Sequence, residues 1–151
     1  MANVGEICKR DVVCASRDTT VAGAAKLLRH HHVGSLIVVE PMNGDGRMPV
    51  GVVTDRDIVI EVTAVDLDPN VITVGDIMAP ELITAPESLG ILETMEVMRF
   101  KGVRRLPIVD RGGLLVGVVS IDDMLEVLAE ELTDLTRIVA REQAREMQGR
   151  K

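Results

Sequence analysis

Two short motifs place a hydroxyl and a carboxylate at the same spacing. Residues 51–57 read Gly-Val-Val-Thr-Asp-Arg-Asp, and residues 117–123 read Gly-Val-Val-Ser-Ile-Asp-Asp. A carboxylate can accept hydrogen bonds from both hydroxyls of a ribose, and charge-assisted bonds of this kind are the stronger ones. A Thr or Ser at the start of a helix lies where free N–H groups favour a phosphate. Binding of a ligand at two matched sites is therefore the first function to consider.

The same spacing also fits a helix cap. Ser or Thr followed three residues later by an acid, just before an apolar run, is the pattern of a capping box. Spacing alone favours the cap, although Asp reaches back less well than the preferred Glu, and a Gly precedes the hydroxyl by three residues in both motifs. A capping hydroxyl and a ligand-facing Asp can coexist, with the Asp pointing away from its own helix. The motif alone leaves both interpretations open.

The motifs belong to a longer internal repeat. At an offset of 70 residues, Val4, Ile7 and Leu36 align with Val74, Ile77 and Leu106, and at an offset of 66 the two motifs align. The difference corresponds to four extra residues within 41–47, a stretch rich in turn formers, whose counterpart at 111–113 is a tight turn. A length difference confined to a surface loop is what a duplicated domain tolerates best.

Hydrophobic periodicity predicts the order β-α-β-β-α in each half. Continuous apolar runs predict buried strands, and spacings of three, four and seven predict helices, the first capped by Asp18 or Thr19. Residues 66–70, Asp-Leu-Asp-Pro-Asn, read as the linker. The first half has strands at 12–15, 35–40 and 49–53, a helix around 21–28 and a helix over 55–62; the second has strands at 82–85, 106–109 and 114–119, a helix around 91–98 and a helix from 121.

Composition limits the partners that the chain can bind. With one Phe and no Trp or Tyr, it has almost no aromatic surface on which nucleic-acid bases could stack, and its net charge of -7 disfavours phosphate backbones and anionic membranes. No apolar run approaches the roughly 20 residues needed to span a bilayer. No signal peptide is visible, and Cys8 and Cys14 do not form a CxxC pair. We therefore expect a reduced, cytoplasmic setting and neither a nucleic-acid nor a membrane partner.

These features together resemble a tandem pair of CBS domains, the family named after cystathionine β-synthase. The two motifs, Asp76-Ile77-Met78, and residues 103–109 (Val-Arg-Arg-Leu-Pro-Ile-Val) carry the resemblance. It implies an α/β (α+β) fold of two β-α-β-β-α repeats packed about a pseudo-twofold axis. The expected divisions are a first domain at 4–65, a linker at 66–73, a second domain at 74–132 and a helical extension at 133–151.

The resemblance also implies two clefts that bind AMP, ADP, ATP, NAD or S-adenosylmethionine, and a homodimer of such modules. Thr54, Asp57, Ser120 and Asp123 are the motif residues of these clefts. Arg56, Arg104 and Arg105 are candidates for phosphate contacts or simple surface cations, and Gly34 lets a ligand approach or merely starts a strand. The remaining candidates are wall residues, most of which would be core residues without a ligand: Ser35, Cys14, Ala15, Thr84, Ala85 and Pro107, with Val33 and Val103.

Two other features of the sequence bear on catalysis, and neither predicts a catalytic site. His30, His31 and His32 are consecutive, so on a helix they point in different directions and predict no metal site; they suit the C-terminal end of a helix dipole. No Ser/His/Asp set, paired catalytic carboxylates or Walker-type loop is present. We expect no enzyme and no catalytic cofactor.

The C-terminal segment carries an apolar seam at alternating spacings of three and four. The seam consists of Leu125, Leu128, Leu132, Leu135 and Val139, and Glu142 breaks it. It covers about two heptads, which is short for a coiled coil, so it predicts packing on the module's own body or support of a homodimer or partner. The sequence thus favours a stand-alone adenosine-ligand sensor that acts on an unidentified partner in trans. The alternative is a structural dimerisation module that binds no ligand.

Overall fold

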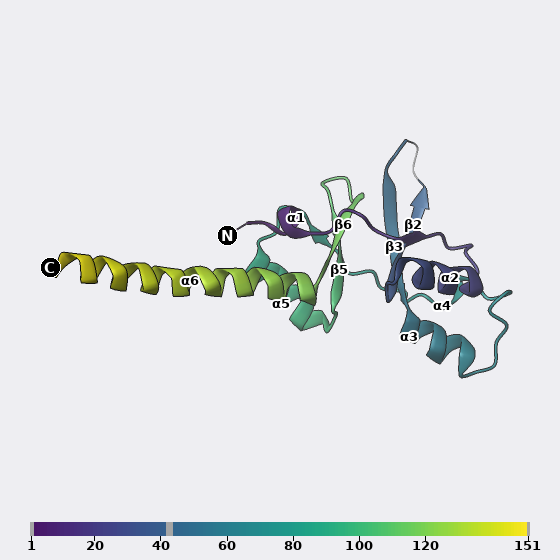
Figure 1. Ribbon diagram of the computed structural model, residues 1–151. Helices are drawn as coiled ribbons and strands as arrows, with labels where there is room; N and C mark the ends of the chain where they lie inside the picture. Colours follow the sequence, from purple (N-terminus) through teal and green to yellow (C-terminus); the bar gives the residue numbers. More distant parts are fainter. Residues whose placement is uncertain (1, 42–43, 151) are drawn as a thin grey trace.

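The computed structural model describes residues 2–41 and 44–150 (Figure 1). Each half contributes a short helix, a three-stranded sheet and longer helices. The first half contains α1 (Val4–Ile7), β1 (Cys14–Ala15), α2 (Val21–His31), β2 (Ser35–Pro41), β3 (Arg47–Thr54), α3 (Asp55–Ile58) and the π-helical turn η1 (Val59–Thr63). The second contains α4 (Val74–Ile77), β4 (Ala85–Pro86), α5 (Ile91–Lys101), β5 (Arg105–Val109), β6 (Leu115–Ser120) and α6 (Ile121–Gly149).

The two sheets have the same topology. In each, the short first strand pairs in parallel with the second, and the second pairs antiparallel with the third, in the orders β1-β2-β3 and β4-β5-β6. Equivalent residues hold equivalent places, because Ser35 lies opposite Thr54 in one sheet and Arg105 lies opposite Ser120 in the other. The sheets meet through β3 and β6. The predicted α/β fold of two β-α-β-β-α repeats is confirmed.

The short helices exchange between the two cores. Val4 of α1 and Cys8 after it are buried with Ile108 and other residues of the second repeat, while Val74 of α4 packs into the core of the first. Backbone hydrogen bonds hold the crossings: the Val4 N–H donates to the Leu89 carbonyl at 2.8 Å, and the Val74 N–H to that of Thr19 at 2.8 Å. The chain that precedes each repeat's first strand therefore completes the other repeat's core.

Several element boundaries differ from the sequence-based expectation. Helix α2 is capped by Thr20, not by Asp18 or Thr19, because the Thr20 hydroxyl accepts the Gly23 N–H at 3.0 Å. The expected helix over 55–62 changes after Ile58 into a π-helical turn. Helices α1 and α4 were not predicted, since four residues are too few to show a helical period. Met42 and Asn43 of the predicted loop lie outside the described residues.

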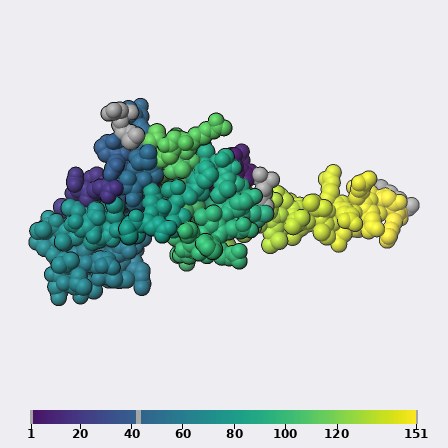
Figure 2. All heavy atoms as spheres, turned by 180° about the vertical axis from the view of Figure 1, so that it is seen from behind, coloured from purple at the N-terminus to yellow at the C-terminus, as the bar shows by residue number. Residues whose placement is uncertain are grey.

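Helix α6 is the exception to the repeat symmetry. It spans 29 residues and extends well beyond both sheets (Figures 1 and 2). The seam residues Leu132, Leu135 and Val139 are 64%, 59% and 55% exposed, so the seam does not pack on the module's own body. Within residues 2–41 and 44–150, no helix is both long enough and apolar enough to cross a membrane.

Candidate functional site

Both motifs form reciprocal helix caps. The Thr54 N–H donates to Asp57 Oδ2 at 2.9 Å, and the Asp57 N–H donates to Thr54 Oγ1 at 3.1 Å. The corresponding Ser120 and Asp123 distances are 2.8 Å and 3.3 Å. The capping interpretation is thus correct for both motifs, and each Asp points back toward its own cap. The cap uses only Oδ2 of each carboxylate, which has about four acceptor positions in all, so Oδ1 can still receive another donor.

The second motif faces a cleft between the two repeats. The cleft has a volume of about 210 Å³ and draws its lining from both halves of the chain. Its apolar lining includes Val12, Val13 and Ile37 from the first repeat, and its polar lining includes Ser120 and Asp123. The first repeat therefore supplies walls for the second repeat's motif. The other lining residues are Lys9, Asp11, Val33, Ser35, Arg105, Val118 and Asp122.

Lys9 reaches this cleft because the chain after α1 pairs with β6. The Lys9 N–H donates to the Val118 carbonyl and the Val118 N–H donates to the Lys9 carbonyl, both at 2.9 Å. Gly117 makes this approach possible, since a Cβ there would lie 2.6 Å from the Lys9 carbonyl oxygen and 2.7 Å from Cys8 Sγ. The motif glycine that recurs in the sequence is therefore a point of close chain contact.

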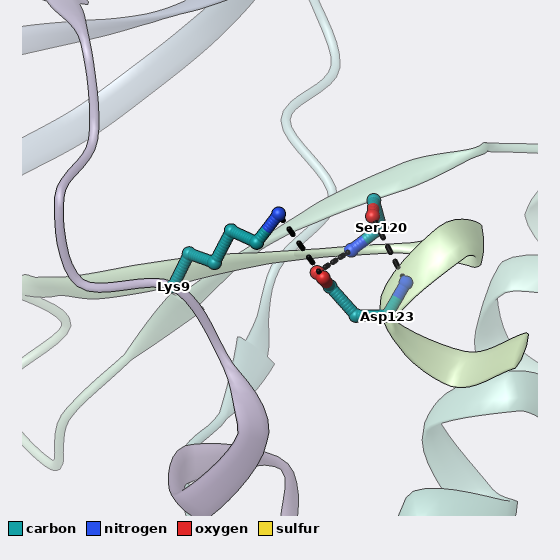
Figure 3. A network of polar contacts seen from close by, with 3 residues as sticks. All are labelled: Lys9, Ser120 and Asp123. Carbon is teal, nitrogen blue, oxygen red and sulfur yellow. Dashed lines mark hydrogen bonds and ion pairs between the residues drawn. The ribbon is translucent and has the colours of Figure 1, made fainter. Parts of the chain in front are cut away.

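The paired backbone brings the Lys9 side chain to Asp123. Figure 3 shows the Lys9 ammonium directed at the carboxylate, with Nζ 3.5 Å from Oδ1. The Asp123 side chain is 8% exposed, whereas that of Lys9 is 71% exposed. Both carboxylate oxygens of Asp123 thus have a donor, one from the cap and one from Lys9. A largely exposed cation therefore holds the second oxygen of a buried carboxylate.

The first motif lacks this cation. Ala79 stands at the position equivalent to Lys9 at the offset of 70. Within the described part of the chain, Asp57 has no ion-pair partner. The two motifs therefore share their capping geometry and differ in what holds the second carboxylate oxygen.

The predicted polar residues have different locations. Ser35, Arg105, Ser120 and Asp123 line the described cleft, as does Val33. Gly34 lies next to it, and a Cβ there would stand 3.9 Å from Arg105 Nη2. Arg104 and Arg56 are exposed, the first just before β5 and the second in α3 beside Thr54 and Asp57.

The predicted wall residues lie mostly behind the cleft. Ala15 and Ala85 are buried in the two cores, and Pro107 is buried in β5 opposite Val118. Thr84 is half-buried just before β4. The half-buried Cys14 accepts a hydrogen bond from Arg47 Nη1 at 3.1 Å, and burial raises the pKa of its thiol despite that cation. None of these residues lines the described cleft.

Sequence reasoning missed seven lining residues: Lys9, Asp11, Val12, Val13, Ile37, Val118 and Asp122. Val118 and Asp122 lie within the second motif and could have been included from their position alone. Lys9 gave no signal, because its place depends on the crossing of the chain after α1. The lining carries two cations and three carboxylates, so the cleft can accept hydroxyl donors at Asp123 and offer Lys9 and Arg105 to an anionic group.

The histidines lie at the end of α2. His30 and His31 are in its last turn, and His32 adopts a left-handed conformation with φ of 54° as the C-cap. No group of three or more His, Cys, Asp or Glu side chains in residues 2–41 and 44–150 is placed to hold a metal ion.

Comparison with known proteins agrees with the repeat structure. The CBS domain family matches residues 4–64 and 74–130. An uncharacterised protein of Methanopyrus kandleri, MK0525, is 38% identical over 125 residues, which cover 83% of this chain and 62% of that protein. Hypoxic response protein 1 of Mycobacterium tuberculosis is 34% identical, with coverage of 86% and 87%.

Solved structures show the same fold. A crystal structure of Hypoxic Response Protein I with two coordinated zinc ions gives a TM-score of 0.70 at 30% identity, covering 83% of this chain and 98% of that one. A crystal structure of CBSX2 in complex with AMP gives a TM-score of 0.73 at 22% identity, covering 86% and 98%. The family match spans both repeats, so this chain belongs to the CBS domain family and carries two CBS domains in tandem.

Proposed function

We propose that this protein is a regulatory module that binds an adenosine-containing ligand between its repeats and acts on a partner protein in trans. The ligand class comprises AMP, ADP, ATP, NAD and S-adenosylmethionine. The observation that carries the proposal is the Asp123 carboxylate, 8% exposed in a cleft that both repeats build. A buried carboxyl acceptor beside the apolar side chains of the same cleft is suited to a diol next to a flat base.

The cleft chemistry supports each part of such a ligand. Val12, Val13 and Ile37 offer apolar surface to a base, and Asp123 offers an acceptor to the ribose hydroxyls. Arg105 at the edge can form paired hydrogen bonds with phosphate oxygens. The AMP complex of CBSX2 shows that a protein with this fold can accommodate an adenine nucleotide.

Ligand entry requires Lys9 to move. The cleft volume of about 210 Å³ is below the roughly 300–1,000 Å³ of ordinary ligand sites. Because the Lys9 side chain is 71% exposed, it can leave Asp123 without disturbing the core. Binding would then exchange an ion pair for ribose hydrogen bonds, which links the ligand to the chain after α1.

The second candidate is a structural module that binds no ligand. The Lys9–Asp123 ion pair favours it, since the pair already satisfies the carboxylate that would hold a ribose. In this case the protein acts through association alone. We also propose a homodimer of CBS modules under either function, to be checked by light scattering at micromolar concentration.

Calorimetric unfolding and titration with the five ligands separate these functions. A ligand at about 100 times its dissociation constant adds roughly 2.7 kcal/mol to the free energy of unfolding, which raises the midpoint by about 5–10 °C at this chain length. Asp123→Asn and Asp57→Asn are the matched variants, because an amide oxygen can still accept the cap N–H but the amide NH₂ cannot accept from a ribose. Each variant is compared with its own ligand-free midpoint.

Binding by the wild type that is lost in one Asn variant assigns the ligand to that motif. No shift with any of the five ligands at millimolar concentration supports the structural module. A shift that both Asn variants retain in full contradicts the ribose role of the two aspartates.

A further inference from the structure

Helix α6 carries its apolar seam far from its own domain. The last side chains of α6 that pack on the core are Met124, which is buried, and Val127, which is partly buried. Every residue from Leu128 to Arg150 is exposed. The helix of 29 residues is about 43 Å long at 1.5 Å per residue, so most of that length projects into solvent, as Figure 2 shows.

The exposed part of α6 has the apolar spacing of a helix that pairs with another helix. Leu128, Leu132, Leu135 and Val139 follow one another at spacings of four, three and four, and they are 39%, 64%, 59% and 55% exposed. Ile138 flanks this stripe and is 61% exposed. Most helical stability in proteins comes from packing of such a face, so a free helix of this kind gains from a partner that covers it.

The charges of α6 are divided along its length. Residues 121–136 contain six acidic side chains and no basic one, whereas residues 137–150 contain four Arg and two Glu. The helix dipole alone does not explain this division. The dipole acts mainly on the terminal turn, whereas the acidic half extends over four turns. A parallel pair of such helices would place two acidic halves side by side. An antiparallel pair places each acidic half beside a basic half.

We propose that α6 pairs antiparallel with α6 of a second copy of this chain. One register puts only apolar residues in the central layers: Leu128 against the partner's Val139, and Leu132 against the partner's Leu135. In the same register Asp122, Glu126 and Glu130 come level with the partner's Arg145, Arg141 and Arg137. These charges lie on the outer faces, so their attraction acts through solvent across the helix pair and weakens as salt is added. The two CBS modules then lie at opposite ends of the helix pair.

This association is separate from ligand binding and from contact between CBS modules. The first test is the mass of the full-length protein by light scattering, with Leu132→Lys/Leu135→Lys as the variant. The matched control is Thr133→Lys/Ala140→Lys, which adds the same charge on the outer face. We expect the seam variant to halve the assembly mass and the control to keep it. Unchanged mass in the seam variant, or a monomeric wild type, overturns the pairing.

Single cysteine substitutions test whether the two α6 helices run antiparallel. They are introduced into a Cys14→Ala variant, which is the background chain. In the proposed register a Leu128→Cys chain mixed with a Val139→Cys chain forms a disulfide-linked dimer on air oxidation, and neither forms one alone, because identical positions lie about 16 Å apart along the axis. A disulfide dimer of Leu128→Cys alone overturns the antiparallel direction. Absence of any linked dimer in the mixture, when the background chain has the assembled mass, overturns the register.

Discussion

Lys9 places its ammonium nitrogen 3.5 Å from Oδ1 of Asp123, while Oδ2 of the same carboxylate accepts the Ser120 N–H at 2.8 Å. This contact ties the chain after α1 to the first turn of α6, and so joins the beginning of one repeat to the last helix of the other. It also gives the two motifs different chemistry, since Ala79 occupies the position equivalent to Lys9 at the offset of 70. A ligand at Asp123 must compete with a cation, and a ligand at Asp57 need not.

Lys9→Ala should strengthen binding of adenosine, the probe without phosphate. The variant frees Oδ1 of Asp123. An ion pair whose cation is largely exposed to solvent contributes about 0.2–1 kcal/mol, so the dissociation constant should fall by roughly 1.5- to 5-fold. Titration calorimetry measures the change, and Lys26→Ala on exposed α2 surface is the control. Weaker adenosine binding in Lys9→Ala would show that Lys9 contacts the ligand instead of competing with it.

The capping hydroxyls should matter for stability without any ligand. Thr54→Ala and Ser120→Ala each remove the acceptor for an N–H in the first helical turn, and loss of such a cap costs about 0.5–2 kcal/mol. Urea unfolding of the ligand-free protein measures this cost. Thr63→Ala, a substitution at the exposed end of η1, serves as the control. Full stability of both cap variants would contradict the structural role of the boxes.

The sequence predicted the parts of the fold that depend on local pattern. Apolar runs located the second and third strands of each repeat, because burial on both faces leaves a direct mark in residue type. The first strands are shorter or shifted, at Cys14–Ala15 and Ala85–Pro86 instead of the expected 12–15 and 82–85. The choice between cap and ligand site for Asp57 and Asp123 could not be made locally. One spacing serves both roles, and the geometry shows that the cap forms while one carboxylate oxygen remains for other donors.

Residues that depend on chain crossing were beyond sequence reasoning. Lys9 lies in the second repeat's cleft because α1 leaves its own repeat, and no periodicity in residues 4–10 signals that exchange. The sequence also predicted cleft walls at Ala15 and Ala85. In the structure these two residues are buried in the cores, and Val12 and Val13 of the chain before β1 line the cleft instead.

Gly117→Ala should be more destabilising than Gly51→Ala. A Cβ at Gly117 would meet the Lys9 carbonyl oxygen at 2.6 Å, which is backbone fixed by the pairing with β6, whereas a Cβ at Gly51 would meet the flexible side chain of Met78. Overpacking of this kind costs about 1–3 kcal/mol when the neighbour cannot move. Chemical denaturation measures both variants against Gly149→Ala, where the added Cβ has open space. Equal losses at Gly117 and Gly51 would contradict the close approach of Lys9.

The cap of α4 should give the protein a measurable acid sensitivity. The Thr73 N–H donates to Asp76 Oδ2 at 2.9 Å, and this backbone bond, followed by the Thr73 side-chain bond, lowers the pKa of the Asp76 carboxyl below its ordinary value. A carboxyl whose pKa is lower in the folded state stabilises the fold fully above its unfolded-state pKa of about 3.9, and that contribution is lost as the pH falls through the folded value. Carboxyl NMR titration should therefore place the Asp76 midpoint below the ordinary range. Asp76→Asn should flatten the fall in unfolding free energy below about pH 4, while Thr73→Ser, which keeps both donors, should preserve it. An Asp76 midpoint at or above the ordinary value would mean that the box at α4 does not form in solution.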